Sequence, residues 1–264
     1  MTQLLTKEFY KTYLSLLDTK LDDALKQIKE REWNVENFKF FTAVSVMSSL
    51  KIEGEEMEVD SYIKHKTLNI EYLPILTQKP NDLYEAYELA RDHKLTKINF
   101  LKSHSIATKH LLHESQRGVV RTGNMIIMDQ QTKRIQYEAA SASIVNNEFE
   151  KLWDELDILL QTKLNTEEIF YYASLLHLVF VKIHPFNDGN GRTARLLEKW
   201  FLSTLLGEHL WYIGSEYHYY KNIQSYYNNL AGTGLFYEEL HYEKCLPFLL
   251  MLPHAMIIKE ANGI

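Results

Sequence analysis

Twelve consecutive residues, HPFNDGNGRTAR at 184–195, combine side chains that could handle a polyphosphate. Gly189 and Gly191 allow the backbone to turn tightly and to approach a ligand closely. A helix that begins there points its free N–H groups back at the loop, which makes the segment a candidate anion site. Arg192 and Arg195 are three residues apart and share a helix face, from which two guanidinium groups can bind phosphate oxygens.

Two more side chains of this segment supply chemistry that a phosphate site alone lacks. Asp188 carries a carboxylate suited to Mg²⁺, a hard cation that usually bridges phosphates to one or two protein oxygens. His184 lies at the other edge of the loop, where a neutral imidazole can take the proton from an attacking hydroxyl. Taken singly, each of these residues is more often structural, so the prediction of group transfer at phosphorus depends on the whole set.

The twelve positions resemble the active-site motif of Fic-domain proteins, His-x-Phe-x-Asp/Glu-Gly-Asn-Gly-Arg-x-x-Arg, at every fixed position. The likeness extends from about residue 35 to residue 230. Residues 118–123 are similar to the entry to the family's flap hairpin, and residues 226–230 to its nucleotide-side helix. The resemblance implies a mainly α fold, a helical bundle with a small β-hairpin flap. Phe186 is expected to anchor the loop in the core, because its side chain is apolar.

The resemblance implies a protein adenylyltransferase that moves AMP from ATP to a Tyr, Ser or Thr hydroxyl of a target protein or of itself. It makes His184 the base and Asp188 the Mg²⁺ ligand. The positions that it assigns to the phosphates or to the adenine side of ATP are Gly189, Asn190, Gly191, Arg192, Arg195, Tyr226 and Tyr227. Gly191 favours AMP transfer, since the related Doc-type kinases carry Lys there and transfer the γ-phosphate. ATP is the default donor, because phosphocholine and UMP transfer are also known in the family.

A shorter motif lies upstream. Residues 49–54, SLKIEG, match the Ser/Thr-x-x-x-Glu-Gly/Asn inhibitory motif that many Fic proteins carry on a helix N-terminal to the catalytic core. By itself the pattern of Ser49, Glu53 and Gly54 is common where a helix ends. Beside the full motif it predicts that Glu53 forms a charge-assisted pair with Arg195 and removes a ligand of the γ-phosphate. If that paired state is favoured by about 3 kcal/mol, fewer than roughly one molecule in a hundred is competent at any time.

Two other functions stay open. Glu53 could activate water instead, so that the same site removes AMP from a modified protein, as some Fic proteins do. The chain could also be a nucleotide-binding regulatory module without transfer activity, although an intact His184 and Asp188 argue against this. The sequence names no target. A hydroxyl-bearing segment of a target could add as a strand to the exposed edge of a hairpin at residues 124–138.

Most of the chain has the three- and four-residue apolar period of helices. One long amphipathic helix is expected over residues 4–28, and a second over residues 35–52 that stops near Gly54. Residues 80–82 predict a turn and a helix N-cap. Further helices are expected at residues 83–93, 95–114, 148–162, 166–183 and 191–206, with aromatic-rich helical segments after them. Residues 125–128 and 134–137 are strand-like runs around a polar turn at 129–133, which predicts a single hairpin.

These elements divide the chain into an N-terminal helical region at 1–95 with the inhibitory motif, a catalytic core at 96–230 and a C-terminal helical extension at 231–264. The formal charge of −6 and the absence of a basic cluster argue against a nucleic-acid partner. The single cysteine, Cys245, excludes an internal disulfide and a multi-cysteine zinc site. We expect a cytoplasmic protein, since the chain shows neither a signal peptide nor the run of about 20 apolar residues that spans a bilayer. A homo-oligomer is left open.

Overall fold

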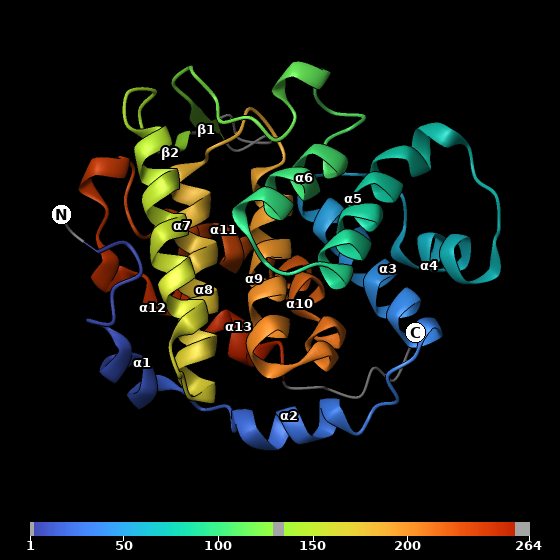
Figure 1. Cartoon of the computed structure of the whole chain (residues 1–264), viewed down its shortest axis with the longest axis horizontal. Coiled ribbons are helices and arrows are strands. Elements are labelled where there is room, and N and C mark those ends of the chain that lie inside the picture. Colours follow the sequence, from blue (N-terminus) through green and yellow to red (C-terminus); the bar gives the residue numbers. More distant parts are fainter. Residues whose placement is uncertain (1–2, 129–134, 257–264) are drawn as a thin grey trace.

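The computed structural model describes residues 3–128 and 135–256. Helices make up the body of the molecule, and a two-stranded hairpin lies at one end of it, which confirms the mainly α fold (Figure 1). The α-helices are α1 (Tyr10–Leu16), α2 (Leu21–Lys29), α3 (Val35–Ile52), α4 (Val59–Leu68), α5 (Pro74–Asp92), α6 (Lys97–Ala107), α7 (Val145–Gln161), α8 (Thr166–Ile183), α9 (Asn190–Leu206), α10 (Ser215–Lys221), α11 (Ile223–Ala231), α12 (Leu246–Leu249) and α13 (Met251–His254). The strands are β1 (Ile126–Met128) and β2 (Ile135–Glu138), and the short 3-10 helices are η1 (Glu114–Gln116), η2 (Glu208–Tyr212), η3 (Tyr237–Glu239) and η4 (Tyr242–Lys244).

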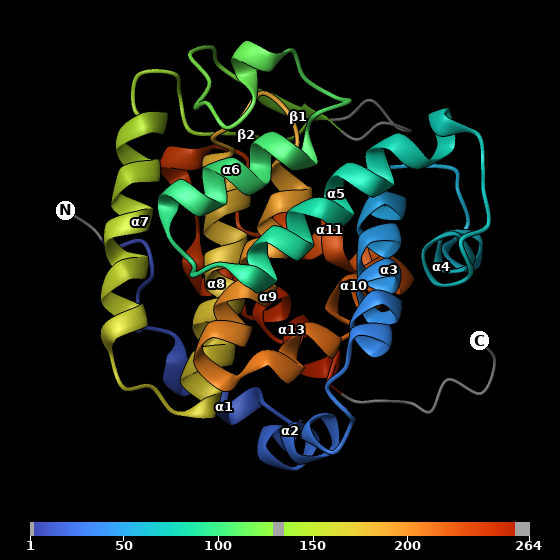
Figure 2. The ribbon, with the colours of Figure 1, turned by 45° about the vertical axis from the view of Figure 1, so that its right-hand side comes forward.

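Helix α8 lies at the centre of the bundle. It begins at a capping box, in which the Asn165 side chain accepts from the backbone N–H of Glu168 and the Glu168 carboxylate accepts from the N–H of Asn165. Every residue of α8 from Ile169 onward is buried, as expected for a helix that is apolar on all sides. Figure 2 shows α7 on one side of the α8–α9 pair and α3 on the other. The loop between α8 and α9 is therefore held at one end of a rigid core.

The prediction of one long helix over residues 4–28 is wrong, because this segment forms two separate helices, α1 and α2. Leu17 takes an extended conformation (φ −72°, ψ 111°), and the Asp18 carboxylate pairs with the imidazole of His254. The break lets α1 pack Tyr10 and Tyr13 edge-on against Tyr171 of α8. Tertiary packing thus overrides a continuous helical period.

The helix expected from residue 83 begins earlier, at Pro74, and α4 was not predicted at all. Pro80 and Asp82 lie inside α5 rather than in a turn before it. Asp82 is buried and caps nothing in its own helix. Its Oδ2 instead accepts from the backbone N–H (2.9 Å) and the imidazole Nδ1 (2.7 Å) of His110, which holds the end of α6 against α5.

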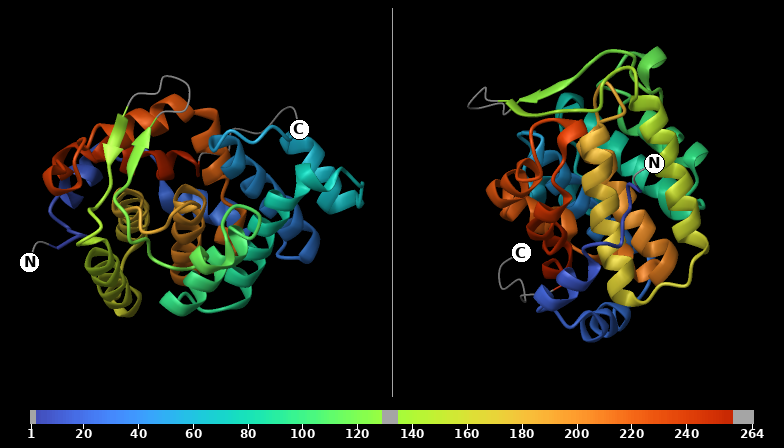
Figure 3. Two further views of the ribbon diagram at one scale, coloured as in Figure 1. Left: turned by 90° about the horizontal axis from the view of Figure 1, so that it is seen from above. Right: turned by 90° about the vertical axis from the view of Figure 1, so that its left-hand side faces the viewer.

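The hairpin pairs β1 and β2 antiparallel, with Ile127 opposite Tyr137, which confirms the predicted strands. It lies on the face of the bundle where α8 ends and α9 begins (Figure 3). Tyr137 is buried against the body, whereas Ile126 and Met128 are exposed. The predicted turn at 129–133 and the last part of the C-terminal extension, 257–264, lie outside the described residues. Within the described chain, no helix combines the length and apolarity that crossing a membrane requires.

Candidate active site

The first and last residues of the loop from His184 to Gly189 have a positive φ, which most residue types avoid. His184 directly follows α8 and has φ +52°, in the left-handed region, where a side chain costs about 1 kcal/mol. Gly189 has φ +82°, and a Cβ there would lie 2.6 Å from Thr108 Cγ2. Glycine is therefore required at the start of α9, as the motif suggested.

Asn190 and Phe186 close the loop. The Asn190 side chain accepts from the Phe186 N–H (2.9 Å) and donates to the Phe186 carbonyl (2.8 Å). Phe186 is fully buried, in keeping with its expected role as an anchor, and its ring stacks on His104 at 3.7 Å between centroids. Asn190 is buried, and both side-chain amide atoms contact the loop itself, so in this structure its side chain braces the loop.

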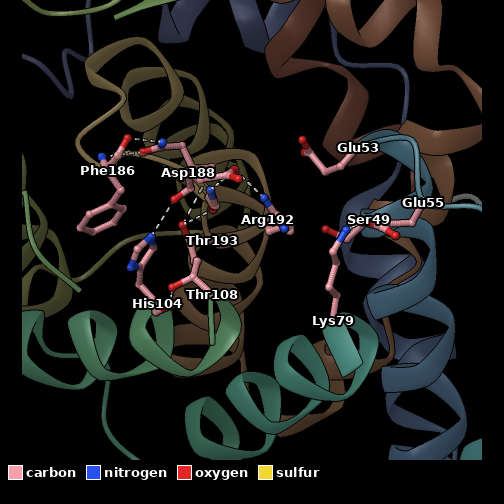
Figure 4. Close-up of polar contacts among 12 residues, drawn as sticks. Ser49, Glu53, Glu55, Lys79, His104, Thr108, Phe186, Asp188, Arg192 and Thr193 are labelled. Carbon is pink, nitrogen blue, oxygen red and sulfur yellow. Dashed lines mark hydrogen bonds and ion pairs between the residues drawn. The ribbon is translucent and has the colours of Figure 1, made fainter. Parts of the chain in front are cut away.

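His104 braces the loop from α6 (Figure 4). The backbone N–H of Gly118 donates to Nδ1 (2.9 Å), so Nε2 carries the proton and donates to the Asp188 carbonyl (2.9 Å). Burial lowers the pKa of His104 to about 4, which keeps this imidazole neutral. No sequence pattern singled out His104, since its partners lie in two other segments of the chain.

Asp188 and Arg192 form an ion pair at the N-terminus of α9 (Figure 4). Asp188 Oδ1 accepts from Arg192 Nη2 (2.6 Å) and from the Gly189 N–H (2.6 Å), and its side chain is 48% exposed. In the described part of the chain, no group of three or more His, Cys, Asp or Glu side chains could hold a metal alone. A single accessible carboxylate beside an anion site does fit Mg²⁺, whose other ligands are phosphates and water.

His184 is in a state suited to act as a base. Its Nδ1 lies 3.1 Å from the Val181 carbonyl and 3.2 Å from the Tyr137 hydroxyl. Since a carbonyl only accepts, we assign the proton to Nδ1, which leaves the Nε2 lone pair available. Burial lowers the pKa of His184 to about 4, so the imidazole is neutral near neutral pH. Tyr137 was not among the predicted site residues, because a single strand residue gives no signal of this contact.

The ion pair expected between Glu53 and Arg195 is present. Arg195 is fully buried, and its Nη2 donates to Glu53 Oε1 at 2.7 Å. Arg195 also donates from Nε to the Ser49 hydroxyl (2.8 Å) and from Nη2 to the Ser49 carbonyl (3.0 Å). Burial alone would raise the pKa of Glu53, but the charges of Arg195 and Arg192 outweigh it and lower the pKa. Glu53 is therefore held as a carboxylate.

Glycines make room for this arrangement. Gly54 has φ +87°, which turns the chain directly after α3 and the carboxylate-bearing Glu53. A Cβ on Gly191 would lie only 2.5 Å from Glu53 Oε1. The Glu53 carboxylate thus occupies the space beside the first turn of α9, where phosphate groups were expected.

Tyr226 and Tyr227 both line the same cavity of about 400 Å³, together with His184, Arg195 and hairpin residues such as Ile127. The Tyr226 hydroxyl lies behind Arg195, from which it accepts at 3.2 Å. The Tyr227 hydroxyl donates to the Ile52 carbonyl (3.0 Å) at the end of α3. In the described structure these hydroxyls therefore support Arg195 and α3.

Comparisons with known proteins agree with this fold. Residues 94–202 match the model of the Fic/DOC family. A Fic family protein from Desulfovibrio desulfuricans is 19% identical, with 97% of this chain and 74% of that chain covered and a TM-score of 0.76. A Fic domain containing signaling protein from Bacteroides thetaiotaomicron is 17% identical, with coverages of 96% and 92% and a TM-score of 0.64. At such identities the two structures show the fold alone.

Curated relatives match shorter stretches. The protein adenylyltransferase Fic of Aedes aegypti is 43% identical over 60 residues, which are 20% of this chain and 11% of that protein. The protein adenylyltransferase Fic of Culex quinquefasciatus is 50% identical over 48 residues, or 16% and 9% of the two chains. These matches therefore span only about a tenth of the relatives' length. The family model, the fold and the loop at 184–195 agree that residues 94–202 of this chain form a domain of the Fic/DOC family.

Proposed function

We propose that the protein transfers AMP from ATP to a hydroxyl group of a target protein, and that Glu53 keeps this activity low. The observation that carries the proposal is the juxtaposition of a neutral imidazole, His184, with the arginine-bearing N-terminus of α9 in one cavity. A helix N-terminus with two arginines on one face favours a polyphosphate. A neutral imidazole beside it supplies the base that group transfer requires.

In the proposed AMP transfer, each residue of the site has its own role. Backbone N–H groups at the start of α9 and the guanidinium groups of Arg192 and Arg195 bind the β- and γ-phosphates. His184 Nε2 takes the proton of the target hydroxyl as its oxygen attacks the α-phosphorus. The bond from this phosphorus to the bridging oxygen breaks, and pyrophosphate leaves with that bond's electron pair. Mg²⁺ held by Asp188 would neutralise charge on the phosphates.

Glu53 opposes this arrangement in two ways. Its carboxylate takes an N–H donor of Arg195 that the γ-phosphate would need, and it adds negative charge where phosphate must enter. It also fills the space beside Gly191. ATP can then bind only with its phosphates displaced, or after Glu53 has left the site.

The target is proposed to dock on the hairpin at 124–138, part of which lies outside the described residues. Near its end, one edge of β2 is already paired with another segment. The Glu138 N–H donates to the Leu235 carbonyl (2.6 Å), and Glu138 forms a parallel β-bridge with Phe236. A target strand would therefore meet the hairpin away from Glu138. Main-chain pairing of this kind tolerates many sequences, so it places a hydroxyl without naming a protein.

The test uses Glu53→Gly protein, Mg²⁺ and a lysate of the source cells, with ATP radiolabelled at the α-phosphate in one reaction and at the γ-phosphate in another. We expect protein labelling from α-labelled ATP alone. Labelling from the γ position would show a kinase, and labelling from neither would leave a nucleotide-binding module. If the unmodified protein, but not Glu53→Gly, released AMP from a labelled target, removal would be the activity. The lowered pKa of Glu53 makes it a weak base for that reaction.

A further inference from the structure

Arg121, in the segment before the hairpin, is a buried arginine whose side-chain hydrogen bonds within the described residues all go to backbone carbonyls. It is 3% exposed, and no salt bridge within the described chain includes it. Its backbone N–H donates to the Pro185 carbonyl (2.8 Å), and its Nε donates to the His184 carbonyl (2.7 Å). Its Nη2 adds a contact with the Ile183 carbonyl (3.2 Å). One residue thus binds three successive carbonyls.

These carbonyls lie where α8 ends and the loop begins. The last carbonyls of a helix lack partners within the helix and form the negative end of its dipole. The Arg121 guanidinium binds the carbonyl of Ile183, the last residue of α8, and that of His184 directly after it, and a positive charge is favoured electrostatically at this helix end. The middle carbonyl belongs to His184, the residue held at φ +52°. Arg121 stabilises the backbone conformation that aims this imidazole at the cavity.

The same guanidinium also binds the two ends of the hairpin. Nη1 donates to the Gly123 carbonyl, which precedes β1, and Nη2 donates to the Ala140 carbonyl, which follows β2, each at 2.5 Å. Arg121 is therefore a direct link between the base and both ends of the proposed docking element. A lysine could not replace it, because one ammonium group cannot reach carbonyls on several sides at once, as the planar fork does.

We propose that Arg121 is a positioning residue that holds His184 in its reactive geometry and fixes the base relative to the hairpin. Its effect on AMP transfer rests on the proposed function, whereas its effect on the geometry of His184 does not. Among the described residues, no hydrogen bond or ion pair joins Arg121 to Arg192, Arg195 or Glu53. Its loss should therefore slow the chemical step and spare ATP binding.

The kinetic test places Arg121→Lys and Arg121→Gln in the Glu53→Gly background. We expect kcat to fall about 100-fold, as for a misplaced catalytic group, with the Kd of MgATP changed by less than about twofold. Arg117→Lys is the matched control, since Arg117 lies four residues away and its Nε donates only to the Leu112 carbonyl (2.9 Å). An unchanged kcat would overturn the proposal, as would a parallel loss of kcat, ATP affinity and melting temperature.

A second measurement does not depend on activity. Nitrogen–proton NMR of the histidine rings should show His184 protonated at Nδ1 in the parent protein and a mixture of tautomers in both Arg121 variants. An unchanged His184 signal in the variants would refute the role of Arg121.

The two proposals can fail separately. If Glu53→Gly transfers no AMP, the proposed function fails, but the NMR spectrum still tests Arg121. If neither variant folds, the parent protein should still show a slowly exchanging Arg121 Nε–H with a nuclear Overhauser contact to His184, and the lack of both would refute it.

Discussion

Glu53→Gly is expected to raise AMP transfer about 10- to 150-fold. The pair that it removes is a charge-assisted hydrogen bond of 2.7 Å to a fully buried guanidinium. Such bonds contribute about 1.5–3 kcal/mol, and each 1.4 kcal/mol changes a two-state population about tenfold. The paired state should therefore outnumber the open state by about that ratio, and deleting the carboxylate should release it.

The substituted protein should still fold. Glu53 has φ −87° and ψ 4°, which glycine adopts readily. Arg195 keeps its bonds to the Ser49 hydroxyl, the Ser49 carbonyl and the Tyr226 hydroxyl, so its charge is not left without partners. We expect the free energy of unfolding to fall by no more than about 3 kcal/mol, the stabilisation that the pair supplies.

The assay is the initial rate of incorporation from α-labelled ATP, with Glu55→Gln as the matched control. Glu55 lies two residues further along and pairs with Lys79 (2.5 Å) at a partly exposed site. Because exposed pairs contribute little, that control should change the rate by no more than about threefold. Equal rates for Glu53→Gly and the unmodified protein would refute the reasoning. So would an equal rise for Glu55→Gln, which would point to general loosening of the segment after α3.

Further outcomes follow from the neighbouring residues. His184→Ala in the Glu53→Gly background should abolish transfer and leave ATP binding by calorimetry intact; retained labelling would remove His184 from the role of base. Since burial lowers the pKa of His184 to about 4, the imidazole stays neutral as pH falls, and kcat should be constant from about pH 8 to about pH 5. A decline near the ordinary histidine pKa would contradict this. Tyr137→Phe removes the hydroxyl near His184 Nδ1 and should lower kcat about tenfold without changing ATP affinity; an unchanged rate would show that the contact is dispensable. Phe186→Ala should lower the free energy of unfolding in urea by about 3–5 kcal/mol, and a loss below about 1 kcal/mol would mean that the loop is not anchored in the core.

Local signals predicted much of the fold. The range expected for α8, residues 166–183, agrees with the structure, in which a capping box starts the helix and its apolar run ends at the loop. The hairpin was predicted from two short strand-like runs around a polar turn. The error at residues 4–28 has a tertiary cause. The helical period continues across Leu17, but packing of α1 on Tyr171 and the pairing of Asp18 with His254 favour a break.

The residues that hold the candidate site in place were harder to predict than the residues that could react. Three residues hold the loop through backbone carbonyls or one ring nitrogen: His104, Arg121 and Tyr137. Because every residue has a backbone carbonyl, the sequence does not indicate which carbonyl will be contacted. The role of the Asn190 side chain was equally hidden, because an amide suits a phosphate ligand and a loop brace alike. Such contacts become visible only when separate segments are placed side by side.

The sequence by itself determined which groups are available, because a contiguous loop that enters a helix brings His184, Asp188 and Arg192 together by local geometry. It also suggested a partner for Arg195, through a motif 142 residues earlier. Only the tertiary structure decided that α3 and α9 meet so that Glu53 lies 2.7 Å from Arg195 and beside Gly191. The reason is physical: local spacing sets which side chains share a loop or a helix face, whereas packing of the whole core sets which helix ends come together.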